Sequence, residues 1–134
     1  MTAAAEARRR RERAGRSAEA VAAVWLRLKG FRIEGRRVRT PAGEIDIVAR
    51  RGGLIVFVEV KARNRYEKAL EAVTPRQQQR IERAAVWYTG HRSRGVCTGM
   101  RFDVIAVRPW RCPQHLVDAW RPAPEGSPGS RRMR

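Results

Sequence analysis

The sequence predicts an α/β sandwich, a mixed sheet flanked by helices, with the element order helix–strand–strand–strand–helix–strand. At its centre, two apolar, β-branched runs flank Gly52-Gly53, which is typical of a β-hairpin with a two-residue turn. An amphipathic stretch at 18–29 precedes the hairpin, and a second one at 75–90 follows it. An alternating stretch at 101–107 supplies the last core strand.

The first helix is expected to begin after the N-cap Ser17 and to end at Gly30. Val21, Trp25 and Leu28 recur at helical spacing and form its predicted buried stripe.

The next stretch, 31–40, is basic and partly alternating, and Pro41 ends it, so it is expected to form an edge strand. Arg36, Arg37 and Arg39 follow one another closely here and are candidate phosphate contacts. Alternatively, these charges only protect an edge strand from aggregation.

The hairpin carries an unusual group of charges at its open end. With the two glycines as the turn, the ladder places Asp46 opposite Glu59 and Glu44 opposite Lys61. Two facing carboxylates repel each other, and burial increases that repulsion unless a cation lies between them. Asp46 and Glu59 are therefore candidate ligands of Mg²⁺ or Mn²⁺. The simpler alternative is a Glu44–Lys61 ion pair with Glu59 at a solvated strand end. The opposite face of the hairpin is apolar and predicted to be buried; it consists of Ile45, Ile47, Val56, Val58 and Val60.

The segment 62–73 has no strand period and is expected to be a loop. The second helix starts with Thr74 as N-cap and Pro75 in the first turn, and Gln77 occupies the position that completes a capping box. Its predicted buried stripe is Ile81, Ala84, Ala85 and Tyr88. In the last strand, Phe102, Val104 and Ala106 share one face, whereas Asp103 is expected to pair with a nearby Arg.

The chain has 134 residues and a formal charge of +17. We expect one domain at 17–120, between a mobile basic arm at 1–16 and a disordered Pro/Gly/Ser-rich tail at 121–134. Residues 17–120 are strongly basic by themselves, which indicates a polyanionic partner such as nucleic acid. No stretch reaches membrane-spanning length and the basic segments lack a large apolar face, so no membrane partner is expected. Two cysteines without an evident pairing fit a cytoplasmic protein.

Asp46, Glu59 and Lys61 form the pattern D-x(12)-E-x-K on a hairpin that follows a helix with a glutamate, which resembles the PD-(D/E)xK nuclease superfamily. Within it, the segments G-E-I-D, F-V-E-V-K-x-R, A-V-T and R-F-D-V closely resemble the YraN-like bacterial family, which is similar to archaeal Holliday-junction resolvases. The resemblance covers about residues 15–120. It implies a restriction-endonuclease-like three-layer sandwich with the core order αβββαβ.

The resemblance also implies roles for single residues. YraN-like proteins show G-x-x-G-E near the first helix, and Gly15 to Glu19 match it except that Ala18 replaces the second glycine. Glu19 aligns with the glutamate that related nucleases direct at the metal, although a first-turn acidic residue also simply complements the helix dipole. Gln77 stands where the family usually has Lys and would contact the scissile phosphate or the attacking water. The capping box explains Gln77 about as well.

Together these features predict a Mg²⁺- or Mn²⁺-dependent endonuclease for structured DNA such as branched junctions. Asp46 and Glu59 would bind the metal, with the Val60 carbonyl as a further ligand, and Lys61 would stabilise the phosphate. The loop residues Arg63 and Arg65 would hold the nucleic-acid backbone together with the edge-strand arginines. The resemblance makes DNA a more attractive partner than RNA and makes a homodimer attractive, although no dimerisation stripe stands out. The alternative is a non-catalytic nucleic-acid-binding protein on a nuclease-like scaffold.

Overall fold

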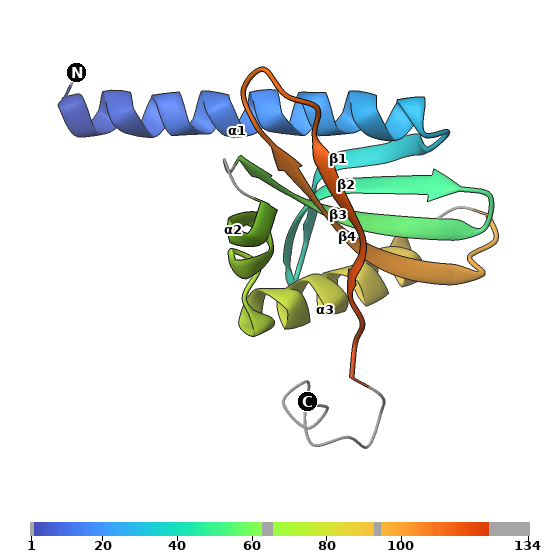
Figure 1. The fold of residues 1–134 in the computed structure, drawn as a ribbon. Helices are drawn as coiled ribbons and strands as arrows, with labels where there is room; N and C mark the ends of the chain where they lie inside the picture. The colour runs from blue at the N-terminus through green and yellow to red at the C-terminus, as the bar shows by residue number, and fades with distance from the viewer. Residues whose placement is uncertain (1, 63–65, 93–94, 124–134) are drawn as a thin grey trace.

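The computed structural model describes residues 2–62, 66–92 and 95–123, and the side chains of 66–68 are outside the description. Its five strands form one sheet in the order β1-β2-β3-β4-β5, in which only the central pair β3–β4 is parallel (Figure 1). In chain order the elements are α1 (Ala3–Leu28), β1 (Arg32–Thr40), β2 (Gly43–Arg51), β3 (Leu54–Ala62), α2 (Tyr66–Glu71), α3 (Pro75–His91), β4 (Gly99–Val107) and β5 (Gln114–Trp120).

The helices lie on both faces of the sheet and make three layers (Figure 1). On one face, α1 packs Ala22, Ala23 and Leu26 against β2, β3 and β4. On the other, α3 and the end of α2 pack against Phe57 and Phe102, whose rings stack with centroids 5.7 Å apart. The predicted mixed sheet flanked by helices is confirmed, and so is the central position of β3.

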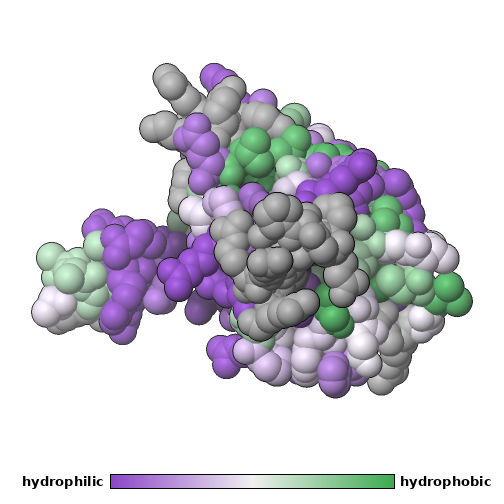
Figure 2. Space-filling model, turned by 90° about the horizontal axis from the view of Figure 1, so that it is seen from below, coloured by the Kyte–Doolittle hydropathy of each residue, from purple (hydrophilic) through white to green (hydrophobic). Residues whose placement is uncertain are grey.

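Helix α1 is much longer than predicted. It begins at Ala3, with Thr2 as N-cap through a hydrogen bond from the Ala5 N–H to Thr2 Oγ1, and it runs through Ser17 without a break. Ala, Arg and Glu are good helix formers, so the like-charged run stays helical. The prediction of a helix start at Ser17 is wrong, whereas the mobility of residues 1–16 stays a prediction. The first half of α1 extends beyond the sheet, and this extension is largely hydrophilic (Figures 1 and 2).

The predicted buried stripe of α1 is also wrong. Val21 and Leu28 are 42% and 77% exposed, and Trp25 is only partly buried. The sheet is instead contacted by the small side chains of the neighbouring stripe, together with Leu26. Small side chains let the helix axis approach the flat sheet closely, which improves packing density. The buried residues of α1 are Ala18, Ala22, Ala23 and Leu26.

The predicted hairpin register is confirmed from Arg51–Leu54 to Ile47–Val58. Gly52 adopts a φ of 62°, which the first central residue of a primed turn requires. The prediction of one apolar face is wrong at Ile45. Ile45 packs on the α3 side of the sheet, whereas Ile47 packs on the α1 side. Strand β2 therefore changes its facing at Asp46.

The segment after β3 contains the short helix α2, where a loop was predicted. Helix α3 starts as predicted: Thr74 and Gln77 form a complete capping box, and the predicted stripe is buried. The helix ends at His91, one residue beyond the predicted Gly90. Within the described part of the chain, no helix is long and apolar enough to cross a membrane.

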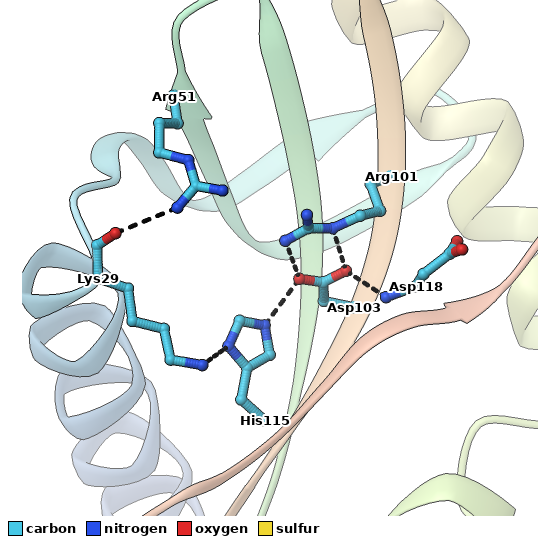
Figure 3. A network of polar contacts seen from close by, with 6 residues as sticks. All are labelled: Lys29, Arg51, Arg101, Asp103, His115 and Asp118. Carbon is cyan, nitrogen blue, oxygen red and sulfur yellow. Dashed lines mark hydrogen bonds and ion pairs between the residues drawn. The ribbon is translucent and has the colours of Figure 1, made fainter.

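Asp103 on β4 joins three elements (Figure 3). Its buried carboxylate accepts hydrogen bonds from Arg101, at 2.9 Å to each oxygen, and from the Asp118 backbone N–H. His115 on β5 lies between Asp103 and Lys29, with its Nε2 2.7 Å from the carboxylate and its Nδ1 2.8 Å from the ammonium. The predicted pairing of Asp103 with an arginine is confirmed, and the network ties β5 to β4 and to the end of α1.

Candidate active site

Asp46 marks the point where β2 and β3 separate. Beyond the Ile47–Val58 pair, its side chain takes over the link between the strands, because Oδ2 accepts a hydrogen bond of 2.9 Å from the Val60 backbone N–H. This bond holds the Asp46 carboxylate beside Glu59, as the register predicted. Burial raises the pKa of Asp46, and the Val60 N–H opposes that rise.

Glu59 is buried, with 8% of its surface exposed, in the middle of the sheet. Its Oε1 has no hydrogen-bond partner among the described residues. Burial first, and then the neighbouring Asp46 charge, raise the pKa of Glu59 to about 8. The Lys61 ammonium lowers the pKa of both carboxyl groups. At neutral pH the pair therefore holds a proton, and a cation would replace it.

Glu19 reaches the same place from α1. Arg37 donates a hydrogen bond of 2.8 Å from Nε to Glu19 Oε2, and the Glu19 side chain is only 12% exposed. The Glu19 charge contributes to the raised pKa of Asp46, which places the two carboxylates in electrostatic contact. Glu19 is thus held at the site by an arginine and is not merely a helix-dipole residue.

These side chains line one cleft of about 420 Å³ between the open end of the hairpin, α1 and α3. It brings together five of the predicted site residues and adds Glu44 and Arg80; its lining includes Glu19, Glu44, Asp46, Glu59, Val60, Lys61 and Arg80. Glu44 does not face Lys61 in a ladder, because it pairs with Arg39 across β1–β2. The alternative of a Glu44–Lys61 cross-strand pair is therefore wrong, and Lys61 faces the cleft.

Gln77 lies outside this cleft. Its Oε1 accepts a hydrogen bond from the Thr74 N–H, and its side chain lines a separate groove with Arg76 and Arg83. The residue of α3 that does line the carboxylate cleft is Arg80, which we did not predict. The signal was available, since Arg80 follows Gln77 by three residues and so lies on the same side of the helix.

The predicted phosphate contacts are placed differently from one another. Arg36 is exposed on the edge strand β1, Arg37 is engaged with Glu19, and Arg39 forms a long 3.8 Å pair with Glu44. Arg63 and Arg65 lie outside the described residues.

The site suits a hard divalent cation. Two carboxylates lie side by side, one oxygen of Glu59 lacks a partner among the described residues, and the Val60 carbonyl belongs to the same cleft. Such oxygen donors are those that Mg²⁺ and Mn²⁺ bind. No group of three or more His, Cys, Asp and Glu side chains close enough to hold a metal occurs in the described ranges. A bound ion would thus rely on two carboxylates, the carbonyl and water or substrate oxygens.

Known proteins resemble most of this chain. A family model of the uncharacterised protein family UPF0102 matches residues 18–107, which contain Glu19, the hairpin and α3. A UPF0102 protein of Paramagnetospirillum magneticum is 49% identical over 114 residues, covering 82% of this chain and 88% of the relative. A UPF0102 protein of Parvibaculum lavamentivorans is 52% identical over 110 residues, covering 82% of this chain and 83% of the relative. One from Rhodopseudomonas palustris strain HaA2 is 53% identical over 111 residues, covering 82% and 86%. The chain therefore belongs to the uncharacterised protein family UPF0102.

Proposed function

We propose that the protein is a metal-dependent endonuclease of the PD-(D/E)xK superfamily with a restriction-endonuclease-like fold, and that the carboxylate cleft is its active site. The observation that carries this proposal is the convergence of Glu19, Asp46, Glu59 and Lys61 in one cleft of a chain with a formal charge of +17. A basic protein attracts a polyanion, and the cleft offers the carboxylate and ammonium groups that phosphodiester hydrolysis requires.

Each residue of the cleft has a role in this reaction. Asp46, Glu59 and the Val60 carbonyl would hold Mg²⁺ or Mn²⁺, which when bound supplies positive charge that activates a water and neutralises the phosphate. Lys61 stabilises the negative charge that develops on the phosphate oxygens while the water oxygen bonds to phosphorus and the leaving oxygen departs. Glu19, oriented by Arg37, is placed to orient the attacking water.

The proposed substrate is structured DNA, such as a branched junction. No sequence-reading helix motif is visible in the sequence, so recognition of backbone shape fits better than recognition of bases. A homodimer would present two clefts to the strands of a junction. Asp46 and Glu59 also argue against a pure binding role, because facing carboxylates repel phosphate unless a cation lies between them.

A second candidate is a nucleic-acid-binding protein without cleavage. It is favoured by Gln77, which stands where the similar nucleases contact phosphate or water but here completes a capping box outside the cleft.

A cleavage assay separates these functions. Linear duplex, single-stranded, flap and four-way-junction DNA, and RNA, are incubated with Mg²⁺, Mn²⁺ or EDTA. We expect metal-dependent cuts that Asp46→Asn and Glu59→Gln each reduce by at least about a hundredfold, since each removes a charged ligand. Glu71→Gln, on the exposed surface of α2, makes the same chemical change away from the cleft and is the matched control.

Binding without metal gives a second readout. In EDTA at pH 7, Asp46→Asn is expected to tighten DNA binding, because it removes a negative charge from a basic cleft. Glu59→Gln is expected to change binding less, because its raised pKa of about 8 keeps Glu59 largely protonated at this pH. Amide variants that cleave as fast as the wild type would refute the assignment of the site. Salt-sensitive binding with no cut on any substrate would favour the second candidate.

A further inference from the structure

A second groove adjoins the carboxylate cleft and is lined mainly by cationic side chains. It has a volume of about 570 Å³ and lies between the β1–β2 turn and the first turns of α3. Its lining includes Pro41, Ala42, Arg76, Gln77, Arg80 and Arg83. Arg80 lines both this groove and the carboxylate cleft, so the two are continuous at that side chain.

The position of Arg80 is set by a close approach to β2. A Cβ atom on Gly43 would lie 2.9 Å from Arg80 Cδ and 3.3 Å from its Nε. The arginine stem therefore crosses the strand where there is no side chain, and its guanidinium reaches the boundary between the two hollows. The φ of 144° at Gly43 is one that other residues rarely adopt.

The arginines of the groove are available to a ligand. Among the described residues, neither Arg76 nor Arg80 forms a hydrogen bond or an ion pair, and Arg83 acts electrostatically on Glu82, whose pKa it lowers against the effect of burial. The first turn of α3 contains no acidic residue. Gln77 uses its Oε1 for the Thr74 N–H, which leaves its amide NH₂ as a donor toward the groove. The lining thus consists of donors at the positive end of a helix dipole.

We propose that this groove is a second phosphate-binding site, which holds the nucleic-acid backbone next to the phosphate in the carboxylate cleft, with Arg80 contacting the backbone between the two. The proposal rests on the function proposed above, since it extends the path of the same polyanion. Phosphodiester oxygens match the lining because guanidinium groups bind them in a bidentate manner. The groove contacts would position the backbone without reading bases.

The test measures DNA affinity in EDTA, so it does not depend on cleavage. Fluorescence anisotropy is recorded with the full-length protein and a labelled four-way junction over a series of salt concentrations. The double variant Arg76→Ala/Arg83→Ala should weaken binding about tenfold or more at moderate salt and lower the salt slope by about one for each lost contact. The control is Arg27→Ala/Arg92→Ala, which removes the same charge from exposed positions outside both hollows.

A rescue variant separates charge from folding. Arg76→Lys/Arg83→Lys should restore most of the affinity, because an ammonium also pairs with phosphate. Circular dichroism melts of all variants show whether the fold is kept. Equal losses in the groove and control doubles, or no loss in either, would overturn the proposal.

Kinetics distinguish this proposal from the cleavage proposal. With a cleaved substrate, the groove double should raise KM with little change in kcat, whereas Arg80→Ala should change both. If no substrate is cut but the groove double still loses affinity selectively, the endonuclease proposal fails and the phosphate site stands.

Discussion

At the scale of the residue, Asp46 explains why the site exists at this end of the sheet. Its side chain replaces a backbone link by accepting the Val60 N–H, exactly where β2 changes the face on which its side chains pack. The change of facing lets the strand ends diverge and opens the cleft. One carboxylate is therefore both a structural link and a proposed metal ligand, which ties the geometry of Glu59 to that of Asp46.

Gly43 should be necessary for both its backbone conformation and its lack of a side chain. Gly43→Ala is expected to lower the free energy of unfolding by about 1–3 kcal/mol, because φ is 144°. Part of that cost comes from the contact with Arg80. In an Arg80→Ala background the cost should therefore shrink by about 0.5 kcal/mol or more.

Urea denaturation of the four proteins in this cycle measures the coupling. Gly52→Ala is the matched control, since Gly52 also has a positive φ of 62° but a Cβ there would meet nothing within 4 Å. Its cost should be the same with and without Arg80. A cost of Gly43→Ala that is unchanged by Arg80→Ala would show that the arginine does not cross the strand at this point.

At the scale of the element, β5 depends on the buried Asp103. Burial opposes ionisation, but hydrogen bonds from His115, Arg101 and the Asp118 N–H together hold the pKa of Asp103 below its usual range. Asp103→Asn should lower the free energy of unfolding by about 3–5 kcal/mol, because it leaves buried donors unmatched. Asp118→Asn, which removes an exposed pair with Arg121, should cost only about 0–1 kcal/mol.

The pH dependence gives this prediction a sign. A carboxyl group with a lowered pKa in the folded state stabilises the protein above its unfolded pKa, and that contribution is lost as the pH falls through the folded value. The difference between wild type and Asp103→Asn should therefore be full at neutral pH and shrink below about pH 4. Chemical denaturation at several pH values measures it. A difference that stays constant down to pH 2 would contradict the assignment.

The elements that sequence predicted best are those whose interactions are local. The capping box of α3 involves residues three apart, and the hairpin register follows from a two-residue turn, so both were predicted correctly. The buried face of α1 was not, because Val21 and Ala22 offer competing stripes and only the partner sheet selects between them. The extent of α1 was missed because the arginine run was expected to interrupt a helix that its alanines sustain.

The candidate site shows the same division. Pairing rules alone placed Asp46 near Glu59, and the family resemblance added Glu19, which the structure places in the same cleft. Arg80 was missed because its approach depends on how α3 lies against Gly43, a contact between distant segments. Ile45 was assigned to the wrong face because strict alternation does not anticipate a strand that changes its facing.

At the scale of the whole molecule, an acidic cleft lies in a strongly basic protein. Gly15 of α1 and Arg80 of α3 line the cleft from different helices, and the basic extension of α1 continues beyond the sheet (Figure 1). The surroundings attract a polyanion, whereas the carboxylates repel it until a proton or a cation neutralises them. Proton binding, metal binding and folding should therefore be linked through Glu59.

The metal-free protein should lose stability as the pH rises. Burial raises the pKa of folded Glu59 to about 8, above its ordinary value of 4.5, so folding favours the protonated form. Its contribution is fully present below pH 4.5 and is lost as the pH rises through about 8, with a slope of at most about 1.4 kcal/mol per pH unit. Urea denaturation in EDTA from pH 5 to pH 9 measures this slope.

Glu59→Gln should flatten the slope, because the amide does not ionise, and Glu71→Gln should leave it unchanged. Mg²⁺ should restore stability above pH 8 in the wild type but much less in Glu59→Gln, since a ligand that binds only the folded state stabilises it. Because the cation displaces a proton, calorimetric titration with Mg²⁺ at pH 7 should release protons to the buffer. Parallel slopes in wild type and Glu59→Gln, with no proton release, would show that Glu59 is not the residue through which pH, metal and folding are linked.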